Sequence, residues 1–83
     1  MSSKIVIYSA NNCPYCRKAK NYLEQNGFTY NEIDLTGNYD KIDELKQSTG
    51  HKTIPLIFVD DQFVGGYTDM IEKINSGELV LRQ

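Results

Sequence analysis

The two residues of this sequence most capable of chemistry are cysteines three positions apart. Cys13 and Cys16 are the only cysteines of the 83-residue chain, and Pro14 and Tyr15 separate them. Such a pair can form a structural disulfide, supply half of a metal site, or open and close as a redox pair. Tetrahedral zinc is the weakest of these alternatives, because it needs four ligands and the chain offers two thiols and one imidazole.

Composition narrows the class of protein. A hydrophobic content of 40% and a charged content of 24% are ordinary for a globular domain, and we expect one domain over residues 1–83. The net charge of -2 argues against a nucleic-acid partner, and no apolar run approaches the about 20 residues of a membrane span. The N-terminal segment does not resemble a signal peptide, so we expect a cytoplasmic protein, in which a permanent structural disulfide is not expected.

Seven segments with regular hydrophobic patterns must position the thiols. The predicted strands cover residues 4–9, 28–35, 56–60 and 62–66, and the predicted helices cover 14–26, 38–49 and 68–76. Because a helix joins the first two strands, they should be parallel with a right-handed crossover, whereas the last two should form an antiparallel hairpin. Thr68 is the predicted N-cap of the last helix. We therefore expect an α/β fold with one mixed four-stranded sheet and three helices, in the order β-α-β-α-β-β-α.

The first predicted helix places Cys13 where its sulfur should be reactive. Pro14 suits the first helical position, which makes Cys13 the N-cap and Cys16 the third helical residue, with side chains able to reach each other. Free amides and the helix dipole favour a thiolate at Cys13, lowering its pKa from about 8.5 into roughly the 3.5–7.5 range. Cys16 should be more buried and less acidic. Further positive charge should come from the nearby basic residues Arg17, Lys18 and Lys20.

Three motifs together resemble the glutaredoxin family. They are "CPYC" at 13–16, "TIP" at 53–55 and "GGYTD" at 65–69, which are similar to the active-site, cis-proline and glutathione-contact motifs of that family in order and spacing. The resemblance spans the chain and implies a thioredoxin-like fold. It also implies a dithiol enzyme that reduces protein disulfides and glutathione mixed disulfides. No bound cofactor is implied, and glutathione would be the co-substrate.

The resemblance also implies roles for individual residues. Cys13 would be the attacking cysteine and Cys16 the resolving one. Pro55 would be the cis-proline, preceded by Ile54, whose backbone would pair with the peptide portion of glutathione. Further glutathione contacts would come from Tyr15, Lys52 and Thr53, and from Thr68 and Asp69, where free helix amides suit the γ-glutamyl carboxylate.

Two positions depart from the family pattern. Relatives commonly carry a lysine three residues before the attacking cysteine, where it meets the glycine carboxylate of glutathione, but this chain has Ala10. Lys52, Lys41 or His51 could take over that contact. Tyr67 stands where many relatives have a small residue or a cysteine. It could form an aromatic rim beside the site, or simply pack under the last helix.

Two other functions stay open at this point. One is a thioredoxin-reductase-dependent electron donor to ribonucleotide reductase, although such proteins usually differ at "GGYTDM" and lack the glutathione contacts. The other is a module in which Cys13 ligates an iron–sulfur cluster between two subunits, which Pro14 disfavours because such relatives usually have glycine there. If the favoured function is right, we expect the protein to be a monomer. Its partners would be glutathione and disulfide-containing or glutathionylated proteins, with ribonucleotide reductase as one candidate. We expect it to bind neither nucleic acid nor a membrane. The sequence leaves the protein substrates and the reduction potential open.

Overall fold

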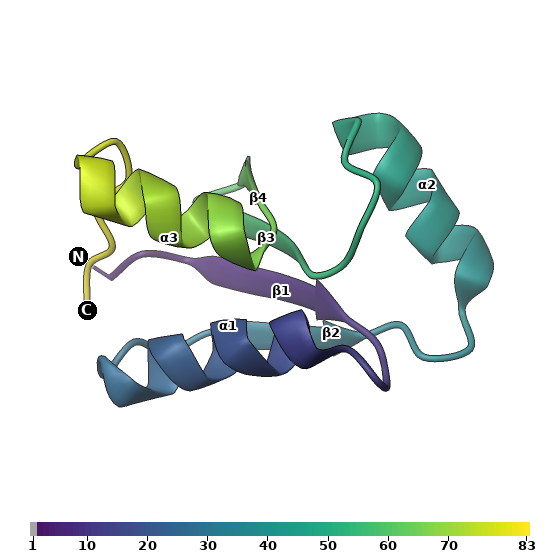
Figure 1. The fold of residues 1–83 in the computed structure, drawn as a ribbon, viewed down its shortest axis with the longest axis horizontal. Coiled ribbons are helices and arrows are strands. Elements are labelled where there is room, and N and C mark those ends of the chain that lie inside the picture. Colours follow the sequence, from purple (N-terminus) through teal and green to yellow (C-terminus); the bar gives the residue numbers. More distant parts are fainter. Residues whose placement is uncertain (1) are drawn as a thin grey trace.

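The fold is a mixed four-stranded sheet with helices α1 and α3 side by side on one face and α2 at one end of the molecule (Figure 1). The computed structural model describes residues 2–83. Its elements are β1 (Ile5–Ser9), α1 (Pro14–Gln25), β2 (Asn31–Asp34), α2 (Tyr39–Thr49), β3 (Leu56–Val59), β4 (Gln62–Gly65) and α3 (Tyr67–Ser76). The strand order is β2-β1-β3-β4. β1 is parallel to β2 and antiparallel to β3, which pairs antiparallel with β4, so the predicted fold class is confirmed.

The main core lies between the sheet and helices α1 and α3. Side chains of β1 alternate, so that Ile5, Ile7 and Ser9 are buried on one face. Ile7 packs in one cluster with Leu23 of α1 and Met70 of α3, all with no exposed surface. This packing fixes α1 and α3 against the sheet and thereby fixes their N-terminal ends relative to each other.

Helix α2 has a separate small core. Ile42 and Leu45 cluster with Leu35 and Leu56, all of them buried. The Asn38 side chain accepts a hydrogen bond from the Lys41 amide at 3.3 Å, which caps the start of the helix. The predicted range 38–49 therefore included the cap residue. Gly50 ends the helix in the left-handed conformation, with φ of 74°.

Two predicted boundaries were wrong. The second strand begins at Asn31 rather than at 28, because Phe28 continues the turn after α1, with its amide donating to the Leu23 carbonyl at 2.9 Å. The N-cap of α3 is Gly66 rather than Thr68, since the Asp69 carboxylate reaches back to the Gly66 amide at 3.0 Å.

The C-terminal segment packs beside the start of the chain (Figure 1). The Ser3 amide donates to the Arg82 carbonyl, and the Arg82 amide donates to the Ser3 hydroxyl, both at 2.9 Å. Leu79 and Leu81 pack against the main core. Within residues 2–83, no helix combines the length and the apolar surface that crossing a bilayer requires.

Candidate active site

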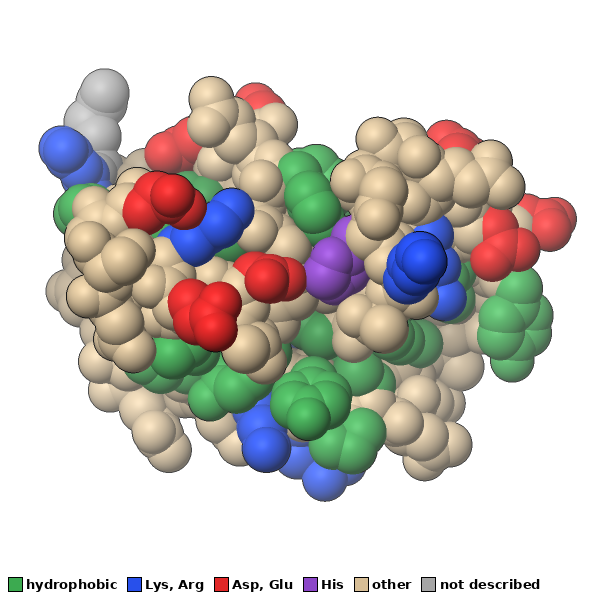
Figure 2. Space-filling model, turned by 45° about the horizontal axis from the view of Figure 1, so that its top comes forward, with side chains coloured by type: hydrophobic (Ala, Val, Ile, Leu, Met, Phe, Trp, Pro, Cys, Tyr) green, Lys and Arg blue, Asp and Glu red, His purple; other side chains and the backbone are tan. Residues whose placement is uncertain are grey.

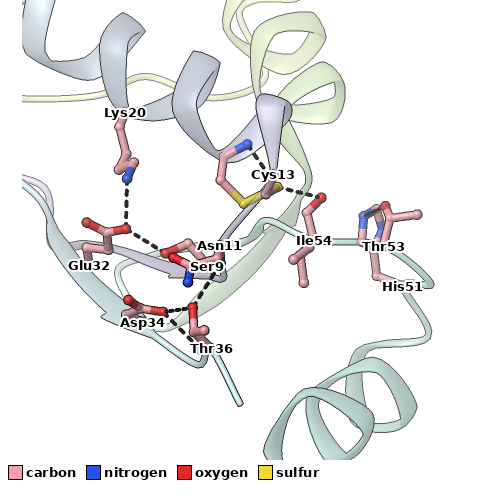
Figure 3. Close-up of a disulfide and its surroundings, with 11 residues drawn as sticks. Ser9, Asn11, Cys13, Lys20, Glu32, Asp34, Thr36, His51, Thr53 and Ile54 are labelled. Carbon is pink, nitrogen blue, oxygen red and sulfur yellow. Dashed lines mark hydrogen bonds and ion pairs between the residues drawn. A yellow bond between two sulfur atoms is a disulfide. The ribbon is translucent and has the colours of Figure 1, made fainter. Parts of the chain in front are cut away.

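The two cysteines meet at the N-terminus of α1. They form a disulfide with their Cα atoms 5.2 Å apart. Cys13 is the N-cap, and its sulfur accepts a hydrogen bond from the Cys16 amide at 3.2 Å, with Pro14 at the first helical position (Figure 3). The predicted capping arrangement is confirmed. The same amide and the helix dipole would stabilise a negative charge on the Cys13 sulfur after reduction.

Burial distinguishes the two sulfur-bearing residues. Cys13 is only partly buried, whereas Cys16 keeps 2% of its surface exposed. A substrate can therefore reach Cys13 more easily than Cys16. This is the order that the sequence predicted for a nucleophile and a resolving thiol.

The segment before β3 forms the second wall of the site. The Ile54–Pro55 peptide bond is cis, which confirms the prediction for Pro55. The Ile54 carbonyl oxygen lies 3.8 Å from the Cys13 sulfur (Figure 3). Strand β3 starts directly afterwards at Leu56, which pairs with Tyr8 of β1. The pairing of β1 with β3 thus holds the two loops of the site together.

The N-terminus of α3 forms the third wall. Gly65 has φ of 126°, and the Asp69 carboxylate packs so closely against it that a Cβ atom there would lie 2.5 Å from Asp69 Oδ2. This contact places the carboxylate on the Gly66 amide at 3.0 Å. The next amides, of Tyr67 and Thr68, belong to the first turn, whose N–H groups have no partner within the helix. They can serve an anion in the groove.

These walls enclose an open groove of about 280 Å³. Its lining residues are Tyr15, His51, Thr53, Ile54, Pro55, Gly66, Tyr67, Thr68 and Asp69. The structure therefore brings together all the predicted glutathione-contact residues except Lys52, which is exposed and does not line the groove. His51 was named in the sequence only as one substitute for the missing lysine, yet it lies inside the groove. Its position directly before the "KTIP" segment was the signal for this placement.

His51 connects two walls of the groove. Its Nε2 atom lies 3.2 Å from the Thr53 hydroxyl, and its Nδ1 atom lies 3.9 Å from Asp69 Oδ2. The ring packs edge-on against Phe63 with 5.5 Å between the centroids. Figure 2 shows the single histidine of the chain (purple) in a hollow of this face, next to acidic side chains (red) and above a group of hydrophobic ones (green).

Two tyrosines form an aromatic rim on the groove. The rings of Tyr15 and Tyr67 lie 6.3 Å apart between centroids with a tilt of 30°. The Lys18 ammonium lies 5.1 Å from the centre of the Tyr15 ring, within the range of a cation–π contact. Tyr67 also packs against the main core. Tyr67 therefore both forms part of the aromatic rim and packs against the core, the two alternatives that the sequence left open.

Lys20, one of the three basic residues expected to add positive charge near Cys13, takes part in an ion pair between α1 and β2. Its ammonium pairs with Glu32 of β2 at 2.8 Å, and the same carboxylate oxygen accepts the Ser9 hydroxyl at 2.6 Å (Figure 3). The Lys20 hydrogen bond, followed by that of Ser9, holds the pKa of Glu32 below its ordinary value. The positive charge of Lys20 is therefore largely balanced within this cluster.

The loop between β1 and Cys13 is tied to the end of β2. The Asn11 amide donates to the Thr36 hydroxyl at 2.9 Å, and that hydroxyl donates to the Asp34 carboxylate at 2.6 Å. The Thr36 hydroxyl and amide together lower the pKa of Asp34. Ala10 is partly buried and packs against the α2 core. Because it is an alanine, the position where relatives commonly have a lysine carries no charge in this chain. Among residues 2–83, no group of three metal-ligating side chains is placed to hold a metal ion.

Comparisons with known proteins agree with this geometry. Residues 5–64 match the family model described as Glutaredoxin. Glutaredoxin 3 of Escherichia coli strain K12 is 37% identical over 82% of each chain, and glutaredoxin-1 of Bos taurus is 36% identical over 95% of this chain and 80% of its own. The buckwheat glutaredoxin–glutathione complex has a TM-score of 0.82 at 32% identity, covering 93% of this chain and 73% of that one. Glutaredoxin 1 from Francisella tularensis, complexed with cacodylate, has a TM-score of 0.78 at 32% identity, covering 93% of this chain and 98% of that one.

Family, fold and thiol geometry thus point to one chemistry. The match covers more than half of the chain, the neighbours share its thioredoxin-like fold, and the cysteine pair stands at the N-terminus of α1. Nothing in the comparisons favours an iron–sulfur module or a dedicated partner of thioredoxin reductase. The chain therefore belongs to the glutaredoxin family and is a thiol–disulfide oxidoreductase with a redox-active Cys13–Cys16 pair.

Proposed function

We propose that this protein reduces protein disulfides and glutathione mixed disulfides with glutathione as the electron donor. The observation that carries the proposal is the position of Cys13. The residue is partly exposed, and its sulfur accepts a hydrogen bond from the Cys16 amide at 3.2 Å and lies 3.8 Å from the Ile54 carbonyl oxygen at the wall of the groove. A substrate sulfur held in the groove would be within reach of this nucleophile.

With a glutathione mixed disulfide, the proposed reaction needs Cys13 alone. The Cys13 thiolate attacks the sulfur of the glutathionyl group, and the substrate thiolate departs with the electron pair of the broken S–S bond and takes up a proton. A second glutathione thiolate then attacks the glutathionyl sulfur on Cys13. Glutathione disulfide leaves, and the Cys13 thiolate is restored.

With a protein disulfide, the proposed reaction needs both cysteines. Attack by Cys13 gives a mixed disulfide with one substrate sulfur and releases the other as a thiol. The Cys16 sulfur then attacks Cys13 Sγ, expels the substrate and forms the Cys13–Cys16 disulfide. Two glutathione molecules return this disulfide to the dithiol and leave as glutathione disulfide.

We place glutathione along the groove that Tyr15, Thr53 and Pro55 line. The cysteinyl part would pair with the Ile54 backbone beside Cys13. The γ-glutamyl carboxylate would lie at the N-terminus of α3, where first-turn amides at Thr68 and Asp69 and the helix dipole favour an anion. The buckwheat relative that shares this fold is complexed with glutathione, which supports glutathione as a ligand of this fold.

The glycine carboxylate would need a cation other than the family lysine. Lys41 is engaged with Glu44 at 3.4 Å on the exposed side of α2. His51 lies in the groove, and the exposed Lys52 follows it directly. We therefore propose that His51 and Lys52 share the contact that Ala10 cannot make.

We further propose that the protein works as a monomer in the reducing cytoplasm, where an exchangeable disulfide has a use and a permanent one does not. Its protein partners would be disulfide-containing or glutathionylated proteins. Ribonucleotide reductase is one candidate among them.

The test is turnover of a small glutathione mixed disulfide under two electron supplies. One assay contains glutathione, glutathione reductase and NADPH, and the other contains thioredoxin reductase and NADPH without glutathione. We expect NADPH oxidation only in the first. Turnover in the second alone would replace this function by that of a thioredoxin-reductase substrate, and visible cluster absorbance of the purified protein with no turnover would support an iron–sulfur module.

A further inference from the structure

Arg17 and Lys18 are two exposed basic residues that directly follow Cys16 on α1. Among residues 2–83, neither of them forms a salt bridge. Lys20, on the same helix, differs from them because it pairs with Glu32 at 2.8 Å. Two basic side chains on a helix are often just a solvated face. This pair differs from such a face in its position beside the nucleophile.

Both basic residues are placed at the edge of the groove by printed contacts with the site. The Arg17 amide donates to the Cys13 carbonyl at 3.2 Å, so Arg17 stands one helical turn from the nucleophile. The Lys18 ammonium lies 5.1 Å from the centre of the Tyr15 ring, which is 54% exposed and lies beside Tyr67 at the aromatic rim. Figure 2 shows basic side chains (blue) next to the hydrophobic group (green) below the histidine. We call Tyr15, Arg17 and Lys18 the α1 edge.

The rest of the groove has a different character. On the α3 side, Asp69 is bound to the Gly66 amide at 3.0 Å, and the exposed Glu72 stands one turn further along the helix. On the β3 side, the wall is the segment at Ile54 and Pro55, which carries no charge. The net charge of the chain is -2, so its long-range field favours a cationic partner. A preference for an anionic partner therefore needs a local surface such as the α1 edge.

We propose that the α1 edge is a docking surface for substrate polypeptides that carry acidic residues next to the target cysteine. The target sulfur must reach Cys13 Sγ, so the residues that flank it must lie against the walls of the groove. An Asp or Glu among them would meet Lys18 and Arg17, while the polypeptide packs on Tyr15. The proposal concerns which polypeptides enter the exchange. It stands on thiol–disulfide chemistry alone, whichever molecule supplies the electrons.

The expected effect is a selectivity that depends on salt. A charge at the rim of a binding surface acts mainly on the association rate, and its effect falls as ionic strength rises. An exposed charge pair changes an equilibrium or a rate by a few-fold. With two basic side chains, we expect about a fivefold preference for an acidic over a basic peptide at low salt, and almost none at high salt.

The experiment is exchange between the reduced full-length protein and three peptides that differ only in the residues next to their single cysteine, which are glutamate, glutamine or lysine. Each cysteine is supplied as a mixed disulfide with thionitrobenzoate. The Cys13 thiolate attacks the peptide sulfur, and coloured thionitrobenzoate leaves with the electron pair of the broken S–S bond. Each rate constant is divided by that of β-mercaptoethanol with the same peptide, which removes differences in intrinsic reactivity. The glutamate peptide should react fastest and the lysine peptide slowest.

Three variants assign the preference to its residues. Lys18→Gln should reduce the ratio of glutamate-peptide to lysine-peptide rates about two- to threefold, and Lys18→Glu should reverse the preference. Lys4→Gln is the matched control, because it removes the same charge just before β1, at the end of the strand remote from Cys13. It should keep the wild-type ratio.

A lysine peptide that reacts fastest with the wild-type protein would overturn the proposal, because the net charge would then control the exchange. Equal rates for all three peptides would overturn it as well and would make Arg17 and Lys18 a solvated face. The same ratio in Lys18→Gln as in Lys4→Gln would show that the preference lies elsewhere. The exchange contains no glutathione, so its result is separate from the test of the proposed function.

Discussion

Replacing Gly65 by alanine should damage the groove through Asp69. A Cβ atom at Gly65 would lie 2.5 Å from Asp69 Oδ2 and 2.6 Å from Asp69 Cβ, closer than real contacts allow. The carboxylate would have to leave the Gly66 amide, to which it bonds at 3.0 Å. The N-terminus of α3 would lose its cap and the groove would lose the shape of one wall.

The magnitude follows from two contributions to the free energy of unfolding. A non-glycine residue at φ of 126° costs about 1–3 kcal/mol, and losing the cap costs about 1 kcal/mol. Gly77→Ala is the matched control, because Gly77 also has positive φ, 83°, but a Cβ atom there meets nothing within 4 Å. That change should cost only about 1 kcal/mol.

The assays are urea unfolding of the oxidised protein and steady-state kinetics with glutathione. We expect Gly65→Ala to lose about 2–4 kcal/mol of stability and to raise the KM for glutathione about tenfold, which corresponds to about 1.4 kcal/mol. Gly77→Ala should keep the wild-type KM. If the two variants have the same stability and the same KM, the contact between Gly65 and Asp69 neither holds the cap of α3 nor shapes the groove.

Three further predictions concern the charges of the site. Ala10→Lys should lower the KM for glutathione a few-fold at low salt and less at high salt, measured by the same kinetics; an unchanged KM would mean that another cation already binds the carboxylate. Asp69→Ala should cost about 1 kcal/mol in urea unfolding and raise KM more than it lowers kcat, whereas a fall in kcat alone would argue against a binding role. Because the folded-state pKa of Glu32 is below its ordinary value of 4.5, its stabilisation is complete above that pH and disappears as the pH falls through the lower value. Glu32→Gln should therefore cost about 1 kcal/mol in urea unfolding at neutral pH and almost nothing in acid, and a pH-independent difference would contradict this.

Much of the fold could be predicted because hydrophobic periodicity reports which faces are buried. The apolar run of β1 and the helical spacing of Cys16, Ala19 and Leu23 both reflect burial in the core. The prediction that the second strand starts at Phe28 was wrong because a hydrophobic pattern reports burial and not the type of backbone structure. Phe28 and Tyr30 pack against that core, which accounts for the hydrophobic pattern, but both lie in the connection that precedes β2 at Asn31.

The site was predictable where local backbone rules determine it. Cys13 as N-cap followed from Pro14, a helix-start signal that acts over neighbouring residues. The cap of α3 was missed because glycine carries no capping side chain, and the partner that reveals it is the Asp69 carboxylate. The pairing of Lys20 with Glu32 joins α1 to β2, and a contact between separate elements has no signal in a single sequence.

The most direct test of the central claim is to compare Cys13→Ser and Cys16→Ser on two substrates, a glutathionylated peptide and a protein disulfide, with glutathione and glutathione reductase supplied. The division of labour between the two sulfurs predicts that Cys13→Ser is inactive on both, because a neutral hydroxyl cannot replace the thiolate. Cys16→Ser should retain turnover of the glutathionylated peptide and fail or slow on the protein disulfide. Equal loss of glutathionylated-peptide turnover in both variants would contradict the account and return weight to a site that needs both sulfurs at once, such as a metal centre.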